Sequence, residues 1–164
     1  MRSSDPPEFD PYSGQLSVLI VENREAAFGA LAEILSADHC ECRFCADWSG
    51  ALFEADRARP DVVLLNPDVT EDHLEDFLSG LQENPKTRRL PVLIISSRRE
   101  AATRRRAFEL GVADFITKPI EAVELLSRVK RHSRLHRYEL NQEALNSRLE
   151  KAVQARTREL EDAN

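Results

Sequence analysis

Short apolar runs separated by amphipathic stretches extend through the first three quarters of the chain. The run at residues 62–65 is Val-Val-Leu-Leu, which is typical of a strand buried on both faces of a parallel sheet. It stops at Asn66 and Pro67, and proline cannot donate a hydrogen bond to a sheet ladder. In open α/β sheets, ligands bind beyond the carboxyl ends of the strands. Asn66 therefore occupies a position where a functional side chain is expected.

The same pattern predicts four further strands and the helices between them. Strands are expected at residues 16–21, 41–46, 91–96 and 113–117. Helical spacing of apolar residues predicts helices at about residues 24–36, 73–83 and 100–110, and another that bears Leu52 and Phe53 and ends before Pro60. Strand and helix alternate five times, which implies right-handed βαβ crossovers and an α/β fold with helices on both faces of a parallel sheet.

Composition and charge narrow the class of protein. A chain of 164 residues is long enough for one domain and an extension. Its net charge of -6 argues against a nucleic-acid binder, and we interpret basic runs such as Arg104-Arg105-Arg106 as solvated helix faces. No apolar run approaches the length of a membrane span, and the N-terminus lacks the apolar region of a signal peptide. We therefore expect no membrane association and a cytoplasmic location.

Three cysteines are grouped at Cys40, Cys42 and Cys45, next to His39. Such a cluster could hold zinc or form a redox pair, which would make the protein a metal or redox sensor. The spacing does not match the usual pairs of zinc ligands, and no second cluster completes a tetrahedral site. We favour a strand in which Cys42 and Phe44 share a face and the cysteines pack as small apolar residues.

Four stretches resemble the receiver domain of two-component response regulators. They are VLIVEN at residues 18–23, PDVVLLN at residues 60–66, PVLIIS at residues 91–96 and LGVADFITKP at residues 110–119. Together they cover residues 16–133 in the order and spacing of the family. The resemblance implies a doubly wound, flavodoxin-like sheet of five parallel strands in the order 2-1-3-4-5.

The resemblance also implies a chemistry, because receiver domains accept a phosphoryl group from a histidine kinase. In the family, an aspartate after the third strand is the acceptor, and an acidic pair after the first strand helps it to hold Mg²⁺. A hydroxyl after the fourth strand and a lysine after the fifth bind the phosphoryl oxygens. Here the acceptor position is Asn66, the acidic-pair positions are Glu22 and Asn23, and the hydroxyl and lysine are retained as Ser96 and Lys118.

These departures predict a degenerate site without catalytic residues. An amide offers no anionic oxygen that could attack phosphorus, so phosphotransfer to Asn66 is excluded. Magnesium favours carboxylate oxygens, and only Glu22 keeps its charge, so we expect weak or absent Mg²⁺ binding and no cofactor. Lys118 is expected to pair with Glu22 and to donate to the carbonyl of Asn66. Phe115 lies at the family's switch-aromatic position and is expected to be buried.

An alternative is that Asp68 accepts the phosphoryl group and the domain remains an active switch. Pro67 and the shifted register are expected to direct Asp68 away from Ser96 and Lys118. Because Asn23 departs from the family pattern as well as Asn66, natural degeneration explains both amides more simply than an engineered change.

The family's domain ends near residue 133, yet helix-forming sequence continues from there. Residues at 3-4-3-4 spacing form the seam of a two-stranded coiled coil, namely Leu135, Tyr138, Gln142, Leu145 and Leu149. Val153 lies four residues after Leu149, so Leu145, Leu149 and Val153 make a 4-4 step, a stutter that locally unwinds the supercoil. Leu160 lies seven residues further on. We expect homodimerisation through this helix, since a lone helix of this length is marginally stable. The alternative is that the helix folds back on its own domain.

Residues 149–161 are similar to the signalling helices that join receiver domains to output domains. Such helices precede cyclic-di-GMP phosphodiesterases, diguanylate cyclases and histidine kinases. We therefore divide the chain into a disordered arm at residues 1–15, a receiver-like domain at residues 16–133 and a coiled-coil helix at residues 134–164. The leading hypothesis is a phosphorylation-independent pseudo-receiver that dimerises and couples to an output domain outside the present sequence.

Overall fold

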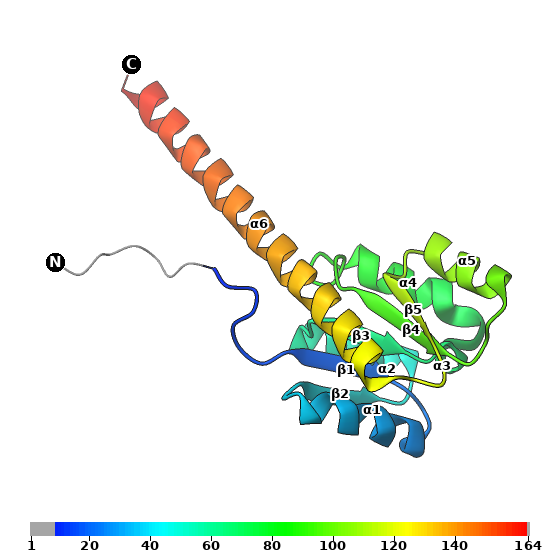
Figure 1. Ribbon diagram of the computed structural model, residues 1–164. Coiled ribbons are helices and arrows are strands. Elements are labelled where there is room, and N and C mark those ends of the chain that lie inside the picture. Colours follow the sequence, from blue (N-terminus) through cyan, green and yellow to red (C-terminus); the bar gives the residue numbers. More distant parts are fainter. Residues whose placement is uncertain (1–8, 164) are drawn as a thin grey trace.

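The computed structural model describes residues 9–163, and its centre is one parallel sheet (Figure 1). The sheet has five strands in the order β2-β1-β3-β4-β5, which confirms the predicted doubly wound α/β fold. The strands are β1 (Ser17–Val21), β2 (Glu41–Cys45), β3 (Val62–Leu65), β4 (Val92–Ser96) and β5 (Asp114–Thr117).

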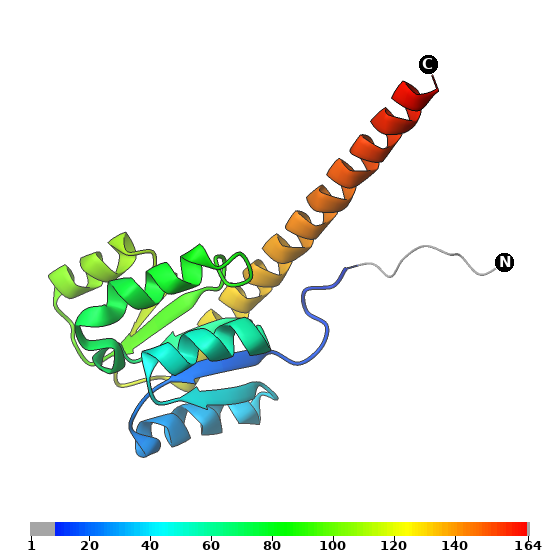
Figure 2. The ribbon, with the colours of Figure 1, turned by 180° about the vertical axis from the view of Figure 1, so that it is seen from behind.

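Helices cover both faces of the sheet, as Figures 1 and 2 show. On one face lie α2 (Trp48–Ala58), α4 (Leu74–Glu83) and α5 (Ala101–Glu109), and on the other lie α1 (Glu25–Ala37) and α6 (Ala122–Asp162). A short helix, α3 (Pro67–Thr70), and a 3-10 turn (Glu71–His73) connect β3 to α4. The predicted helices and strands are therefore present, with ends that differ by one or two residues.

The core consists of two apolar layers that are separated by the sheet. All four residues of β3 are buried, because this central strand has neighbours on both sides and helices on both faces. Alternate residues face opposite layers, so that Val63 packs with α2 and α4 whereas Leu64 packs with α1 and α6. The continuous apolar run in the sequence reflects this burial on both sides.

The edge strand β2 differs from the expectation. Phe44 was predicted to share a buried face with Cys42, but the Phe44 side chain is 44% exposed and Cys42 is only half-buried. The ring of Phe44 packs at 4.7 Å against that of Phe28 from α1. The prediction of a buried face is wrong, because β2 has a strand neighbour on one side only and lies at the border of the helix layer.

Helix α6 is continuous over 41 residues, as the absence of proline and glycine predicts. Its first part packs on the sheet through Leu125, Val129, Ser133 and His136. From Ala144 to Ala163 every side chain is exposed, and this part extends away from the domain (Figure 1). Within residues 9–163, no helix combines the length and the apolar character that a membrane span requires.

An ion pair fixes α6 where it leaves the domain. The guanidinium of Arg137 donates from Nε and Nη2 to the two carboxylate oxygens of Asp61, at 2.8 and 2.9 Å. Arg137 also donates to the carbonyls of Ser13 and Gln15, and Asp61 accepts from the backbone N–H of Ser17. The hydrogen bonds that Arg137 donates to Asp61 raise the pKa of Arg137. This cluster, the Asp61–Arg137 clamp, joins α6 to the starts of β1 and β3.

The Asp61–Arg137 clamp also contacts part of the predicted N-terminal arm at residues 1–15. Residues 1–8 lie outside the described residues. Residues 9–15 lie beside α6, where Arg134 stacks over the ring of Tyr12 at 4.3 Å and Arg137 holds two backbone carbonyls.

We predict that Arg137→Met lowers the free energy of unfolding by about 2 kcal/mol, because it leaves the mostly buried Asp61 carboxylate without its cation. Urea denaturation followed by circular dichroism measures this change. Arg148→Met is the matched control, since Arg148 lies on the exposed part of α6, and its denaturation midpoint should equal that of the parent. Equal midpoints for all three proteins would show that the clamp does not stabilise the fold.

Candidate functional site

Glu22 and Asn66 meet at the carboxyl edge of the sheet. Val21 and Leu65 are partners in the β1–β3 register, so the residues that follow them are adjacent. The amide Nδ2 of Asn66 donates to both carboxylate oxygens of Glu22, at 3.1 and 3.0 Å. Both side chains are buried, with 2% of Glu22 and 7% of Asn66 exposed. We call this contact the Asn66–Glu22 pair.

Each remaining polar atom of the pair also has a partner. Oδ1 of Asn66 accepts from the backbone N–H of Asp68 at 3.0 Å and thereby caps α3. Oε1 of Glu22 accepts from the backbone N–H groups of Asn23 and Arg24. The carboxylate is thus stabilised mainly by neutral donors, and the Arg24 guanidinium is 3.9 Å away on an exposed side chain.

The predicted ion pair between Lys118 and Glu22 is wrong. No ion pair within residues 9–163 involves Lys118, because the amide of Asn66 occupies both oxygens of the carboxylate. Lys118 is half-buried and lines a cavity of about 290 Å³ with residues of α1 such as Leu31 and Ile34. Ser96 is buried, and its Oγ accepts from the backbone N–H of Arg98 at 3.1 Å.

The donor set does not fit the magnesium site that the resemblance implies. Of the three ligand positions, only Glu22 carries a carboxylate, and its oxygens already accept four hydrogen bonds. Asn66 directs its amide nitrogen, not its oxygen, at that carboxylate, and Asn23 is exposed. Hard divalent cations need several oxygen ligands directed at one point, and this arrangement does not provide them.

Comparison with known proteins identifies the family to which the chain belongs. The family model for the response regulator receiver domain matches residues 18–130. The chain belongs to the receiver-domain family. As in other receivers, the domain is a regulatory module of two-component signalling.

Curated relatives of this receiver domain are longer proteins. The response regulator PleD of Caulobacter vibrioides is 35% identical over 115 residues, which are 69% of this chain and 25% of PleD. The sensory transduction protein RegX3 of Mycobacterium tuberculosis is 34% identical over 114 residues, which are 70% of this chain and 49% of RegX3. The chain therefore spans between a quarter and a half of the length of these relatives.

Solved structures share the fold. A response regulator from Desulfuromonas acetoxidans has a TM-score of 0.66 at 26% identity, covering 73% of this chain and 98% of its own. The receiver domain of the histidine kinase PA1611 from Pseudomonas aeruginosa, described with a magnesium ion in its active-site cleft, has the same TM-score at 19% identity over 73% of this chain and 98% of its own. The second similarity concerns the fold alone.

Two further positions of the receiver pattern lie apart from the pair. Phe115 is 2% exposed, which agrees with the expected burial, and the Arg104 guanidinium lies 5.5 Å from its ring centre. Asp68 lies in α3 with an exposed side chain, and its carboxylate is 3.6 Å from the guanidinium of Arg98. The ion pair of Asp68 therefore lies at the surface of the domain.

The three cysteines of this receiver domain do not converge. Cys45 packs on one face of the sheet, whereas Cys40 and Cys42 pack on the other. Burial raises the pKa of all three thiols, so they stay protonated at neutral pH. Within residues 9–163, no group of three or more histidine, cysteine or acidic side chains could hold a metal ion.

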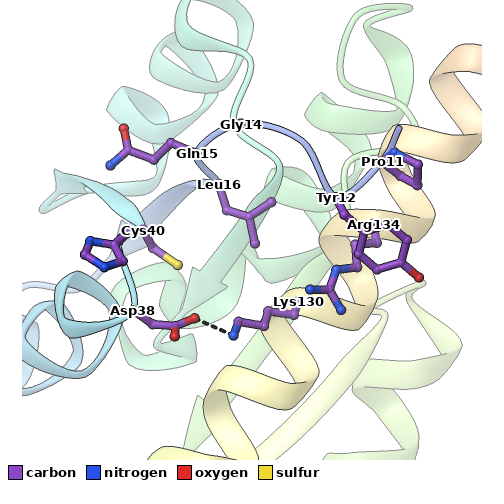
Figure 3. A pocket seen from close by; sticks show the side chains of 10 residues that line it. Pro11, Tyr12, Gly14, Gln15, Leu16, Asp38, Cys40, Lys130 and Arg134 are labelled. Carbon is purple, nitrogen blue, oxygen red and sulfur yellow. Dashed lines mark ion pairs between the residues drawn. The ribbon is translucent and has the colours of Figure 1, made fainter. Parts of the chain in front are cut away.

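Cys40 lies beside a groove near the N-terminal segment, shown in Figure 3. The cavity of about 340 Å³ is bordered by Tyr12 and Arg134 and by the Asp38–Lys130 ion pair of 2.5 Å. Since Asp38 and Lys130 pair with one another, neither offers an unpaired charge to the Cys40 thiol. This environment supports a structural role for the thiol.

The sequence contained a signal for the Asn66–Glu22 pair that the prediction missed. Both residues directly follow central strands that pair in register, so contact between them could have been anticipated. That Glu22 accepts from the Asn66 amide and not from the Lys118 ammonium could not have been anticipated, because it depends on side-chain directions at the edge of the folded sheet.

We predict that Asn66→Asp destabilises this receiver domain by about 2 kcal/mol at pH 8, since it removes two hydrogen bonds and places a second carboxylate about 3 Å from Glu22. The loss should be smaller at pH 4, where the two carboxyl groups share a proton and repel less. Urea denaturation at both pH values measures it.

Asn66→Ala is the control for the loss of hydrogen bonds without added charge, and its effect should vary less with pH. An Asn66→Asp variant as stable at pH 8 as the parent would contradict the predicted repulsion within the pair.

Proposed function

We propose that this receiver domain is a pseudo-receiver, which regulates through protein contacts without accepting a phosphoryl group. The observation that supports this proposal is the Asn66–Glu22 pair. The acceptor position carries an amide with no anionic oxygen, and both ends of that amide already serve structural hydrogen bonds. A nucleophile of the carboxylate type is therefore missing where the family's reaction needs it.

The same pair supports the expectation that magnesium binding is weak or absent. A cation would have to take the oxygens of Glu22 away from the Asn66 amide and from two backbone N–H groups. It would gain only one carboxylate in return, whereas Mg²⁺ sites normally provide more charge and a near-octahedral set of oxygens. We infer that the Asn66 amide takes over the role of the cation. It stands in place of a carboxylate that would repel Glu22, and it donates hydrogen bonds to both oxygens of the Glu22 carboxylate.

Homodimerisation through α6 is the second part of the proposal. The exposed part of α6 has no packing partner within the described chain, and an isolated helix of this length is marginal in water. Six large apolar side chains of α6 lie within a sector of about 80° on a regular helix, and each is between 49% and 64% exposed. They are Leu135, Tyr138, Leu145, Leu149, Val153 and Leu160.

A parallel pair of α6 helices would place two receiver domains at one end and two output domains at the other. We propose that these output domains are of the cyclic-di-GMP phosphodiesterase, diguanylate cyclase or histidine kinase type. This part rests on the similarity of residues 149–161 to signalling helices and on the greater length of relatives such as PleD. Regulation would then act through the relative position of the two helices.

We predict that incubation with acetyl phosphate and Mg²⁺ adds no phosphoryl mass to the protein, as measured by intact mass spectrometry. The reason is the absence of an anionic acceptor at Asn66. A receiver domain that keeps its acceptor aspartate, treated in parallel, controls for the reagent. An added phosphoryl mass that disappears in Asp68→Ala would identify Asp68 as the acceptor and replace the pseudo-receiver proposal by an active switch.

We predict that the protein is a dimer in solution and that the double variant Leu149→Glu, Val153→Glu is a monomer, because like charges in an apolar seam oppose pairing. Multi-angle light scattering after size exclusion measures the mass. The matched control is Ser147→Glu, Gln154→Glu, which adds the same charge to the opposite side of α6 and should remain dimeric. A monomeric parent chain would contradict the dimer proposal.

A further inference from the structure

The apolar seam of α6 contains one uncharged polar residue. From Leu135 to Val153, every seam position is apolar except Gln142, whose side chain is exposed. Gln142 lies seven residues after Leu135 and seven before Leu149, so all three share one heptad position, called a. Beyond Val153 the spacing passes through Arg156, whose long side chain can carry its charge to solvent. The amide of Gln142 has no such reach and would lie between two paired helices.

Two asparagines border the seam at the level of Gln142. With Gln142 at position a, Asn141 lies at position g and Asn146 at position e, and these positions meet across a parallel pair of helices. Asn141 of one protomer would lie beside Asn146 of its partner, while the two Gln142 side chains face one another. Each amide both donates and accepts hydrogen bonds. The amides of two protomers can therefore satisfy one another within a single layer.

The charges one heptad earlier fit the same arrangement. Arg134 lies at position g and Glu139 at position e, and both side chains are half-buried. Neither takes part in an ion pair within residues 9–163, although Arg134 stacks over the ring of Tyr12. In a parallel pair without a shift, Arg134 of one protomer lies beside Glu139 of its partner. Opposite charges then meet on both sides of the seam.

A shifted register would lose this match. If one helix moved by one heptad, about 10 Å along the axis, Gln142 would face Leu135 or Leu149 of its partner. Its amide would then be enclosed by apolar side chains without a hydrogen-bond partner, which is costly. The same shift would separate Arg134 from Glu139. The polar layer therefore opposes shifted registers.

An antiparallel pair is unfavourable for a different reason. The two Gln142 side chains could meet in it only if the helices crossed at that residue. Val153 would then lie opposite Arg131 and Leu160 opposite Glu124, both within the part of α6 that packs on the sheet. Apolar seam residues would face charged side chains and lose the apolar contacts that stabilise a coiled coil.

We propose that Gln142, with Asn141 and Asn146 beside it, fixes the pair of α6 helices as parallel and in register. This inference rests on the homodimer proposed above and assigns the residues that determine its geometry. The amide layer lies five residues beyond Arg137, so the geometry is set close to the point where α6 leaves the domain. Both receiver domains then lie at the same height along the paired helices, and the two C-terminal ends of α6 lie side by side.

Disulfide cross-linking of two reporter variants tests this geometry. Leu135→Cys and Leu149→Cys each place a thiol in the seam, one heptad before and one heptad after Gln142. The two proteins are mixed, allowed to exchange and oxidised. Mass spectrometry of their peptides identifies the joined positions, so the native cysteines can stay in place.

We expect only like-with-like products, which join position 135 to 135 and position 149 to 149, because a disulfide needs Cα atoms within about 7 Å of each other. A shift of one heptad would give no disulfide at either position. An antiparallel pair that crosses at Gln142 would join position 135 to position 149 instead.

Gln142→Leu should remove this selectivity. The variant replaces the polar layer by an apolar one, so the dimer affinity measured by sedimentation equilibrium should rise about tenfold. In the two reporter proteins, products that join position 135 to position 149 should then appear beside the like-with-like products. Gln154→Leu is the matched control, since it makes the same change on the opposite side of α6. It should keep the products and the affinity of the parent.

The outcomes separate this inference from the homodimer itself. In a dimeric parent, products that join position 135 to 149, or no disulfide at either position, would overturn the parallel, in-register geometry. A Gln142→Leu protein that still gives like-with-like products alone would overturn the role of Gln142. A parent chain that is monomeric by light scattering would overturn the homodimer, and this inference with it.

Discussion

A carboxylate at the buried edge between β1 and β3 needs a cation or a hydrogen-bond donor beside it, and a second carboxylate there would repel it. The arrangement of the site follows from this constraint. In this receiver domain the donor is built into the chain, because the Asn66 amide binds both oxygens of Glu22. The one buried carboxylate of this edge therefore accepts hydrogen bonds at both of its oxygens.

The proposed pseudo-receiver function directs attention to α6, the helix that leaves the domain. The helix is anchored at the amino edge of the sheet by the Asp61–Arg137 clamp, at the opposite end from the Asn66–Glu22 pair. From Ala144 onward its side chains are exposed. His136 lies at that junction, where it is buried and its ring nitrogens have no hydrogen-bond partner in the described structure.

The two ends of the sheet thus differ in how their charges are satisfied. At the carboxyl edge a buried carboxylate is balanced mainly by neutral donors, and no cation is needed. At the amino edge the Asp61 carboxylate is balanced by the bidentate guanidinium of Arg137.

The sequence by itself determined the sheet, the order of its elements and the two residues that follow β1 and β3, because burial on both faces and helical amphipathicity leave periodic patterns in a chain. It also revealed the amide at the acceptor position. Only the tertiary structure decided that Glu22 binds Asn66 rather than Lys118, that Phe44 is exposed, and that Asp61 meets Arg137 across 76 residues. Such contacts depend on strand edges and side-chain directions, which local periodicity does not encode.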